Sequence, residues 1–181
     1  DAMIKLLHIP KNAGTSMQKA IGTPSIGHKR FKDLKGGKYF ACVRNPYDRA
    51  VSVYWFMRKI QSNIPFNLAA TFKNINEFWR DIPTARTSER VGLIDPQMDF
   101  LKEKGGNGIS PRIETVLRYE TLADDWPAFA LLHDLPPLPH KNKSELRPAT
   151  HWREQLNKES IAKIGELYAD DFEHLNYERI S

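Results

Sequence analysis

Two short apolar runs, each followed by a loop and then by a helical pattern, constrain the fold of this chain most strongly. Residues 3–9 form an apolar run that ends at Pro10, and a PKNAG turn then leads into a helix. A second run, residues 39–43, ends at Arg44, and a helical pattern from Tyr47 follows. Runs this short are typical of buried strands, because a helix needs ten or more residues. The repeated order of strand, loop and helix predicts an α/β fold with a parallel sheet.

The rest of the chain predicts one further strand and several helices. We expect a strand at residues 115–119 and a helix from residue 122 to residue 133. Residues 136–148 are too rich in proline for either regular element, so we expect a loop there. The chain has 181 residues and no internal repeat, and one domain commonly holds roughly 100 to 200 residues. We therefore predict a single domain over residues 1–181.

Composition excludes several classes of protein. With 40% hydrophobic and 27% charged residues the chain is neither disordered nor fibrous. The single cysteine, Cys42, has no partner for a disulfide within the chain and lies in an apolar run, so we expect an inert core residue. No apolar run approaches the length of a transmembrane helix, and the first residues lack a signal-peptide pattern. We therefore expect a cytoplasmic protein with no membrane segment.

Charge is distributed unevenly along the chain, although the net charge is only +5. The first 60 residues carry 12 Lys or Arg against three acidic residues, a balance of +9, and the remainder carries 15 against 19, a balance of −4. Such an excess attracts negatively charged ligands to one surface. The sequence thus predicts an anionic ligand near the first third of the chain, without naming its class.

The segment HIPKNAGTS, residues 8–16, is a candidate anion-binding loop. A loop that leaves a strand and enters a helix presents backbone N–H groups and the positive end of the helix dipole to an anion. Lys11 adds a positive charge, Gly14 allows close approach of a ligand, and Thr15 and Ser16 add hydroxyl groups and serve as helix caps. The segment is not a Walker A loop, because Lys11 precedes the glycine. An ordinary turn with a solvated lysine is the alternative interpretation.

A second candidate segment is VRNPYDRAVSVY, residues 43–54. Ser52 follows Arg44 by eight residues, in the predicted helix. The guanidinium group of Arg44 and the hydroxyl group of Ser52 could thus hold one terminal phosphate from two directions. The alternative is structural: Arg44 pairs with Asp48, and Ser52 bonds back to its own helix.

Together the two segments resemble motifs of the sulfotransferases that use 3′-phosphoadenosine 5′-phosphosulfate (PAPS), in particular the branch that includes Golgi carbohydrate sulfotransferases. Their usual forms are close to IPKTAGTS and RDPxxRxxSxY. Weaker similarity continues through SIGHKRFKDL, QMDFL, VLRYETL, LPHKNKS and LYADDFEHLNY, and thus spans nearly the whole chain. Asn12 stands where the family commonly has Thr, and Asn45 stands where it commonly has Asp.

The resemblance implies a role for each matching residue. The 5′-phosphosulfate would be bound by Lys11 and by the backbone amides of Asn12, Ala13, Gly14, Thr15 and Ser16. Lys11 would also stabilise charge on the bridging oxygen, and Arg44 and Ser52 would bind the 3′-phosphate. His28, in IGHK, is similar to the histidine assigned as catalytic base in uronyl sulfotransferases. A neutral imidazole accepts a proton at pH 7, and the alternative is a surface histidine in a basic run.

Other residues receive weaker assignments. A basic loop that would close over the cofactor or acceptor, or else remain solvated, consists of Lys141, Asn142, Lys143 and Ser144. Lys29, Arg30, Lys32, Lys35 and Lys38 would attract an anionic acceptor. The six histidines lie far apart in the sequence, so we expect no metal site.

The resemblance therefore implies a three-layer, P-loop-like α/β fold with a central parallel sheet flanked by helices. It implies a PAPS-dependent O-sulfotransferase that moves a sulfuryl group to a hydroxyl, most plausibly on a saccharide, without a required metal. An ATP- and Mg²⁺-dependent phosphotransferase and a basic nucleic-acid-binding module are the alternatives, and the missing Walker lysine and recognition motif weigh against them. A Golgi lumen location is the alternative to the cytoplasm.

Overall fold

Three parallel strands organise the first part of the molecule, and their order in the sheet is β1-β2-β3. The computed structural model describes residues 4–22, 29–30, 34, 36–59, 68–82, 92–139 and 147–180. The chain divides into two compact units: residues 1–45 with 95–141, and residues 46–94 with 142–181. Each unit has a hydrophobic core of its own. The expectation of a single domain therefore stays a prediction.

The sheet of the first unit is built around its central strand. It contains β1 (Lys5–Leu7), β2 (Tyr39–Val43) and β3 (Ile113–Arg118). Leu6 lies opposite Phe40, and Ala41 lies opposite Val116. All five residues of β2 are buried, which explains its continuous apolar sequence, because a central parallel strand is covered on both faces and both edges.

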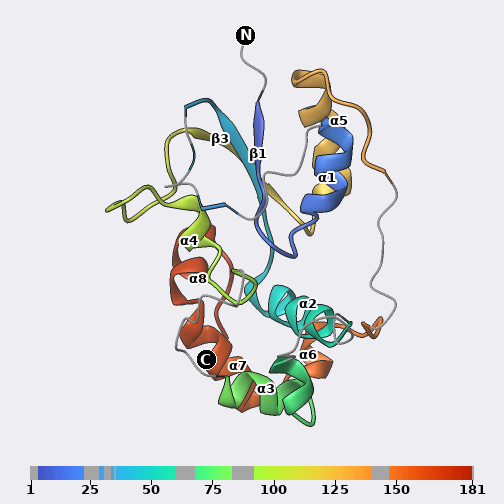
Figure 1. Cartoon of the computed structure of the whole chain (residues 1–181), viewed down its shortest axis with the longest axis vertical. Helices are drawn as coiled ribbons and strands as arrows, with labels where there is room; N and C mark the ends of the chain where they lie inside the picture. Colours follow the sequence, from blue (N-terminus) through green and yellow to red (C-terminus); the bar gives the residue numbers. More distant parts are fainter. Residues whose placement is uncertain are drawn as a thin grey trace. The chain divides into compact units, whose positions relative to one another are not determined.

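Two helices cover one face of this sheet (Figure 1). They are α1 (Gly14–Ile21) and α5 (Leu122–Leu132). Phe40 on the sheet contacts Phe129 of α5 at 4.7 Å between ring centroids and Trp126 at 6.2 Å. Met17 and Ala20 of α1 join the same core. Packing of both helices on one face fixes where the loop between β1 and α1 begins and ends.

A short helix, α4 (Met98–Leu101), also belongs to the first unit. Its residues Met98, Phe100 and Leu101 are buried, and Gln97 immediately before it has no exposed surface. A GGNG turn follows, and a bridge between Lys102 and Ile109 closes it. The glycines of this segment thus form a turn between Lys102 and Ile109.

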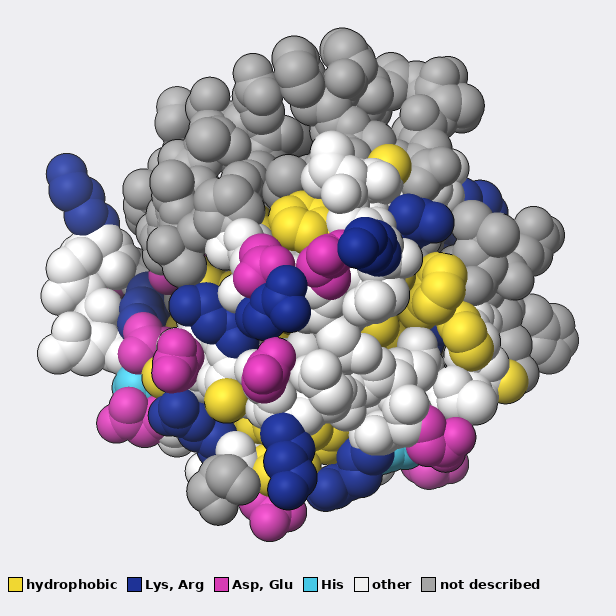
Figure 2. Space-filling view, turned by 90° about the horizontal axis from the view of Figure 1, so that it is seen from below, with side chains coloured by type: hydrophobic (Ala, Val, Ile, Leu, Met, Phe, Trp, Pro, Cys, Tyr) yellow, Lys and Arg dark blue, Asp and Glu magenta, His cyan; other side chains and the backbone are white. Residues whose placement is uncertain are grey.

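The regular elements that the structure describes in the second unit are all helices. They are α2 (Pro46–Lys59), the 3₁₀ helix η3 (Leu68–Thr71), α3 (Ile75–Asp81), α6 (Trp152–Gln155), α7 (Lys158–Leu167) and α8 (Ala169–Leu175). Residues 49–54 of α2 are all buried, including the polar residues Arg49 and Ser52. Tyr47 stacks on Trp152 at 4.7 Å. On the face drawn in Figure 2, Lys and Arg side chains lie among Asp and Glu side chains rather than gathering by sign.

The predicted α/β fold with a parallel sheet flanked by helices is confirmed. The strand expected at residues 39–43 is β2, but the first strand is shorter than residues 3–9 and is limited to Lys5–Leu7. The expected hydroxyl caps of the first helix are wrong. Thr15 and Ser16 lie inside its first turn, and Ala13 is the N-cap residue, without a side-chain hydrogen bond.

Candidate active site

The loop that leaves β1 makes a tight turn before α1 begins. Lys11 and Ala13 both adopt positive φ angles, 69° and 59°, which few residues other than glycine adopt. The carbonyl group of Ala13 accepts hydrogen bonds from the amides of Ser16 (3.0 Å) and Met17 (3.1 Å). The amides of Ser16 and Met17 thus serve the helix, so in this geometry those of Gly14 and Thr15 are better placed for an anion.

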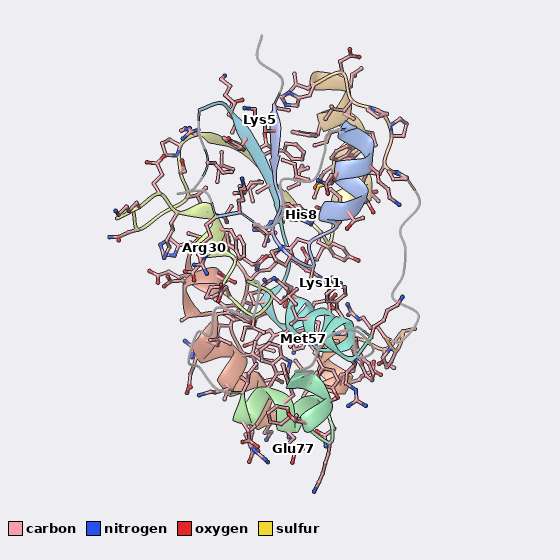
Figure 3. The ribbon with its side chains drawn as sticks, in the orientation of Figure 1. Lys5, His8, Lys11, Arg30, Met57 and Glu77 are labelled. Carbon is pink, nitrogen blue, oxygen red and sulfur yellow. The ribbon has the colours of Figure 1, made fainter. Side chains whose placement is uncertain are left out.

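Gly14 has a packing role that its sequence pattern does not reveal. A Cβ atom at this position would lie 1.9 Å from Cδ2 and 2.0 Å from Nε2 of His8. Figure 3 shows His8 and Lys11 along the chain that leaves β1. The buried imidazole of His8 therefore rests against the start of α1, and any larger side chain at position 14 would displace it. Close approach of a ligand at Gly14 stays a prediction.

Arg44 directly follows β2, and its side chain reaches the loop between β1 and α1. Its Nη1 donates a hydrogen bond to the carbonyl oxygen of Lys11 at 3.0 Å. Its guanidinium group also lies 3.8 Å from the ring centroid of Tyr119, at the end of β3. Arg44 is only 5% exposed. The two candidate segments thus meet at the carboxyl ends of β1 and β2, where ligands bind in parallel α/β sheets.

A third segment, which the sequence analysis did not single out for a role, joins the two loops. The Oε1 atom of Gln97 accepts hydrogen bonds from Asn12 Nδ2 at 2.6 Å and from the backbone amide of Arg44 at 2.9 Å. Gln97 Nε2 donates to the carbonyl oxygen of Arg44 at 2.8 Å. Asn12 Nδ2 also donates to the carbonyl oxygen of Cys42 at 2.9 Å. Gln97 stands in the QMDFL motif, but nothing local in the sequence reveals these distant partners.

The two positions at which this chain departs from the family motifs both make hydrogen bonds, Asn12 through its side chain and Asn45 through its backbone amide. Asn12 is 1% exposed, and its side chain bonds to Cys42 and Gln97 within the protein. The backbone amide of Asn45 donates to Glu120 Oε1 at 2.6 Å. Glu120 thus accepts a backbone hydrogen bond from the loop that follows β2.

Ser52 lies in α2 and belongs to the second compact unit. It is 9% exposed. Arg49, one turn earlier, has no exposed surface, and its Nη2 donates to the carbonyl oxygen of Leu93 at 3.1 Å. Asp48 accepts a hydrogen bond from Arg147 within the same unit. The predicted role of Ser52 toward a 3′-phosphate stays a prediction.

Several predicted residues lie outside the described part of the chain. They are His28, the predicted base, and the basic loop of Lys141, Asn142, Lys143 and Ser144. Lys32 and Lys35 of the basic run also lie outside it. Of the basic residues that are described, Lys29 is exposed, and Arg30 and Lys38 bind carboxylates of the chain itself. Arg30 pairs with Asp95 and Asp99, beside α4 (Figure 3).

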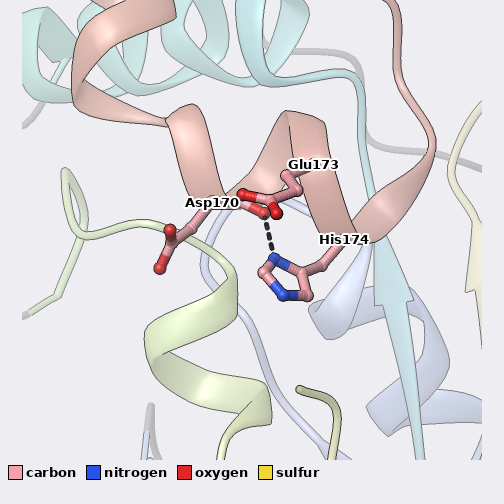
Figure 4. A group of neighbouring side chains, drawn as sticks. All are labelled: Asp170, Glu173 and His174. Carbon is pink, nitrogen blue, oxygen red and sulfur yellow. Dashed lines mark hydrogen bonds between the residues drawn. The ribbon is translucent and has the colours of Figure 1, made fainter. Parts of the chain in front are cut away.

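One surface group of the second unit has the residue types of a metal site. Asp170, Glu173 and His174 on α8 offer ligand atoms that lie within 4.8 Å of one another (Figure 4). The two carboxylates are exposed, and His174 Nδ1 donates to the carbonyl oxygen of Asp170 at 3.0 Å. Such exposed groups are common on helices without an ion, so we assign no metal to them.

Comparisons with known proteins give one match. The family model described as "Sulfotransferase family" matches residues 23–178. The matched range includes Arg44, Ser52 and Gln97 and begins after the loop that contains Lys11. No curated protein and no solved structure matches the chain. Among the described residues, no helix is both long enough and apolar enough to cross a membrane.

Proposed function

Because the chain belongs to the sulfotransferase family, we propose that it transfers the sulfuryl group of PAPS to a hydroxyl group of a saccharide. Family membership makes the protein a sulfotransferase, whereas the donor and the acceptor are our proposal. The observation that carries the proposal is the hydrogen bond between Arg44 and the Lys11 carbonyl group, which joins the two motifs that resemble donor-binding segments.

The residues at this edge of the sheet fit a donor with two separate anionic ends. Two cationic side chains, Lys11 and Arg44, belong to loops that contact one another, and the start of α1 adds the positive end of a helix dipole. A guanidinium group suits a phosphate, because its planar N–H groups match phosphate oxygens. In the proposal Lys11 and the first amides of α1 hold the 5′-phosphosulfate, and Arg44 and Ser52 hold the 3′-phosphate.

Each residue then has a defined task in the reaction. Bound PAPS supplies an electrophilic sulfur atom and a phosphate leaving group. The acceptor oxygen bonds to sulfur while the bond from sulfur to the bridging oxygen breaks, and Lys11 stabilises the negative charge that collects on that oxygen. His28 accepts the proton of the attacking hydroxyl. The saccharide as acceptor rests on the resemblance of both motifs to the carbohydrate branch.

Ligand-dependent stability tests the choice of donor. Adenosine 3′,5′-bisphosphate, the product left by PAPS, should raise the melting temperature, because a ligand at about 100 times its Kd stabilises the folded state by about 2.7 kcal/mol. ATP with Mg²⁺ should give a smaller shift. A shift with ATP and Mg²⁺ and none with the bisphosphate would instead support a phosphotransferase.

Transfer of labelled sulfate from PAPS to a panel of saccharides tests the reaction itself. His28→Ala should lower kcat by about 10²- to 10⁴-fold, the usual contribution of a positioned acid or base. Lys11→Ala should lower kcat by about 10²- to 10³-fold, as the loss of a group that stabilises transition-state charge typically does. Lys19→Ala is the matched control, because Lys19 is an exposed lysine in the last turn of α1. Normal turnover of His28→Ala would remove the base assignment and leave the family membership unaffected.

A further inference from the structure

We propose that Gln97 is a positioning residue. It holds the loop that contains Lys11 and the loop that contains Arg44 at a fixed position relative to each other. The inference rests on the proposed function, because it assigns the two loops to opposite ends of one donor. Gln97 itself has no exposed surface, so it acts through the loops and not by touching the donor.

Three hydrogen bonds of Gln97 to the two loops use both ends of its amide group. Oε1 accepts from one donor on each loop, Asn12 Nδ2 and the amide of Arg44, and Nε2 donates to the carbonyl group of Arg44. Only a side-chain amide of this length offers an acceptor and a donor side by side. Arg44 is therefore held on both its backbone N–H and its backbone C=O, which fixes the direction in which its side chain leaves the strand.

The element that carries Gln97 is itself anchored in the first unit. Met98, Phe100 and Leu101 of α4 are buried. Asp99 of α4, which is half-buried, pairs with Arg30 at 3.4 Å, and Arg30 also binds Asp95. The buried side chains of α4 and the ion pairs with Arg30 thus hold α4 in place. The three hydrogen bonds of Gln97 therefore position the two loops relative to α4.

The position of the two loops relative to each other affects only the affinity of a ligand that binds both of them. Adenosine 3′,5′-bisphosphate and adenosine 5′-monophosphate differ only in the 3′-phosphate, and in the proposal only that group binds Arg44. The ratio of their two affinities therefore measures how well the second loop is placed relative to the first. General loss of stability lowers the melting temperature and leaves this ratio unchanged.

Titration calorimetry of both nucleotides with the parent protein and with Gln97→Met tests the inference. Methionine has a similar length and has neither the acceptor oxygen nor the donor NH₂ group of the amide. We expect the affinity ratio to fall about 10- to 100-fold, since each lost hydrogen bond is worth about 0.5–1.5 kcal/mol and 1.4 kcal/mol corresponds to a factor of ten. Affinity for the monophosphate should change less than about threefold, roughly the effect of one weak hydrogen bond.

Gln155→Met is the matched control, because Gln155 also uses both ends of its amide. It accepts from Trp55 Nε1 at 2.9 Å and donates to the carbonyl group of Thr150 at 3.0 Å, all within the second unit. This variant should lose stability and keep the affinity ratio. Asn12→Thr, which removes one of the three hydrogen bonds of Gln97 and introduces the residue common in the family, should lower the ratio about 3- to 10-fold.

The outcomes separate the two proposals. If the parent protein does not prefer the bisphosphate over the monophosphate, the proposed donor is wrong, and the role of Gln97 falls with it. If the parent protein has this preference and folded Gln97→Met keeps it, the role of Gln97 alone is overturned. Should Gln97→Met fail to fold, an unchanged ratio in Asn12→Thr overturns the inference.

Discussion

A cation stacked on an aromatic ring is the contact that most directly shapes the candidate site at the scale of single residues. The guanidinium group of Arg44 lies 3.8 Å from the ring centroid of Tyr119 and donates to the Lys11 carbonyl group. The amide of Tyr119 donates in turn to the carbonyl group of Val43 at 2.8 Å. Arg44 is thus oriented before any ligand arrives, which lowers the entropy lost on binding.

Substitution of Tyr119 tests this orientation. Tyr119→Leu should weaken binding of adenosine 3′,5′-bisphosphate about 2- to 30-fold, since a cation–π contact is worth about 0.5–2 kcal/mol. Tyr119→Phe retains the ring and should bind the nucleotide like the parent protein. Titration calorimetry measures both affinities, and equal losses in the two variants would show that the hydroxyl group, and not the ring, supports Arg44.

At the scale of elements, the turn between β1 and α1 stores backbone strain. Ala13 occupies the left-handed region with φ 59° and ψ 13°, and Lys11 two residues earlier has φ 69°. Such conformations are costly for any residue with a Cβ atom and are found where the surrounding structure imposes them. Here the contacts that impose these conformations include the hydrogen bond of Arg44 to Lys11 and the packing of His8 on Gly14.

Glycine at position 13 tests the strain. Ala13→Gly should raise the free energy of unfolding by up to about 1 kcal/mol, because the relief of left-handed strain exceeds the extra entropy of the unfolded chain. Ala20→Gly, in the last turn of α1 with its methyl group buried in the core, should lower it by about 1 kcal/mol or more. Urea unfolding followed by circular dichroism compares the two. A loss of stability in Ala13→Gly would show that the turn is not strained.

The elements of this fold differ in how well the sequence predicts them. β2 was predicted from end to end, because a central parallel strand is apolar at every position. The sequence does not predict Ala13 as the N-cap of α1, because neither Lys11 nor Ala13 belongs to a residue type that favours positive φ. Gln97 was missed as a positioning residue because its partners, Asn12 and Arg44, lie 85 and 53 residues away along the chain.

At the scale of the whole molecule, each unit has its own core that contains aromatic rings, and the core of the first includes Phe40, Trp126 and Phe129. The first places its polar groups at the ends of parallel strands, around the candidate site. The second buries aromatic rings, and Tyr47 is central to them: it stacks on Trp152, contacts Phe172 at 4.9 Å and accepts a hydrogen bond from the amide of Ile180 at 3.1 Å. Tyr47 thereby ties the last residues of the chain to α2.

Two buried tyrosines make the stability of the second unit decrease as the pH rises above about 10. Burial raises the pKa of Tyr47 and of Tyr54 above the usual value of 10.0, and the hydrogen bond from Ile180 opposes the shift at Tyr47 without cancelling it. A group whose pKa is higher in the folded state favours folding below its unfolded pKa. That contribution is lost as pH rises through 10 and toward the folded value, because the unfolded chain then gives up the proton more readily.

Tyr47→Phe isolates this effect. At pH of about 8 the variant should be less stable than the parent protein by about 1 kcal/mol, since it no longer accepts the hydrogen bond from Ile180. As pH rises above 10 the difference should shrink, because the parent protein loses stability through Tyr47 while phenylalanine does not ionise. Urea unfolding at several pH values, with ionisation followed by tyrosinate absorbance, measures both quantities. A difference in unfolding free energy that stays constant across this range would mean that Tyr47 ionises alike in the folded and unfolded chain.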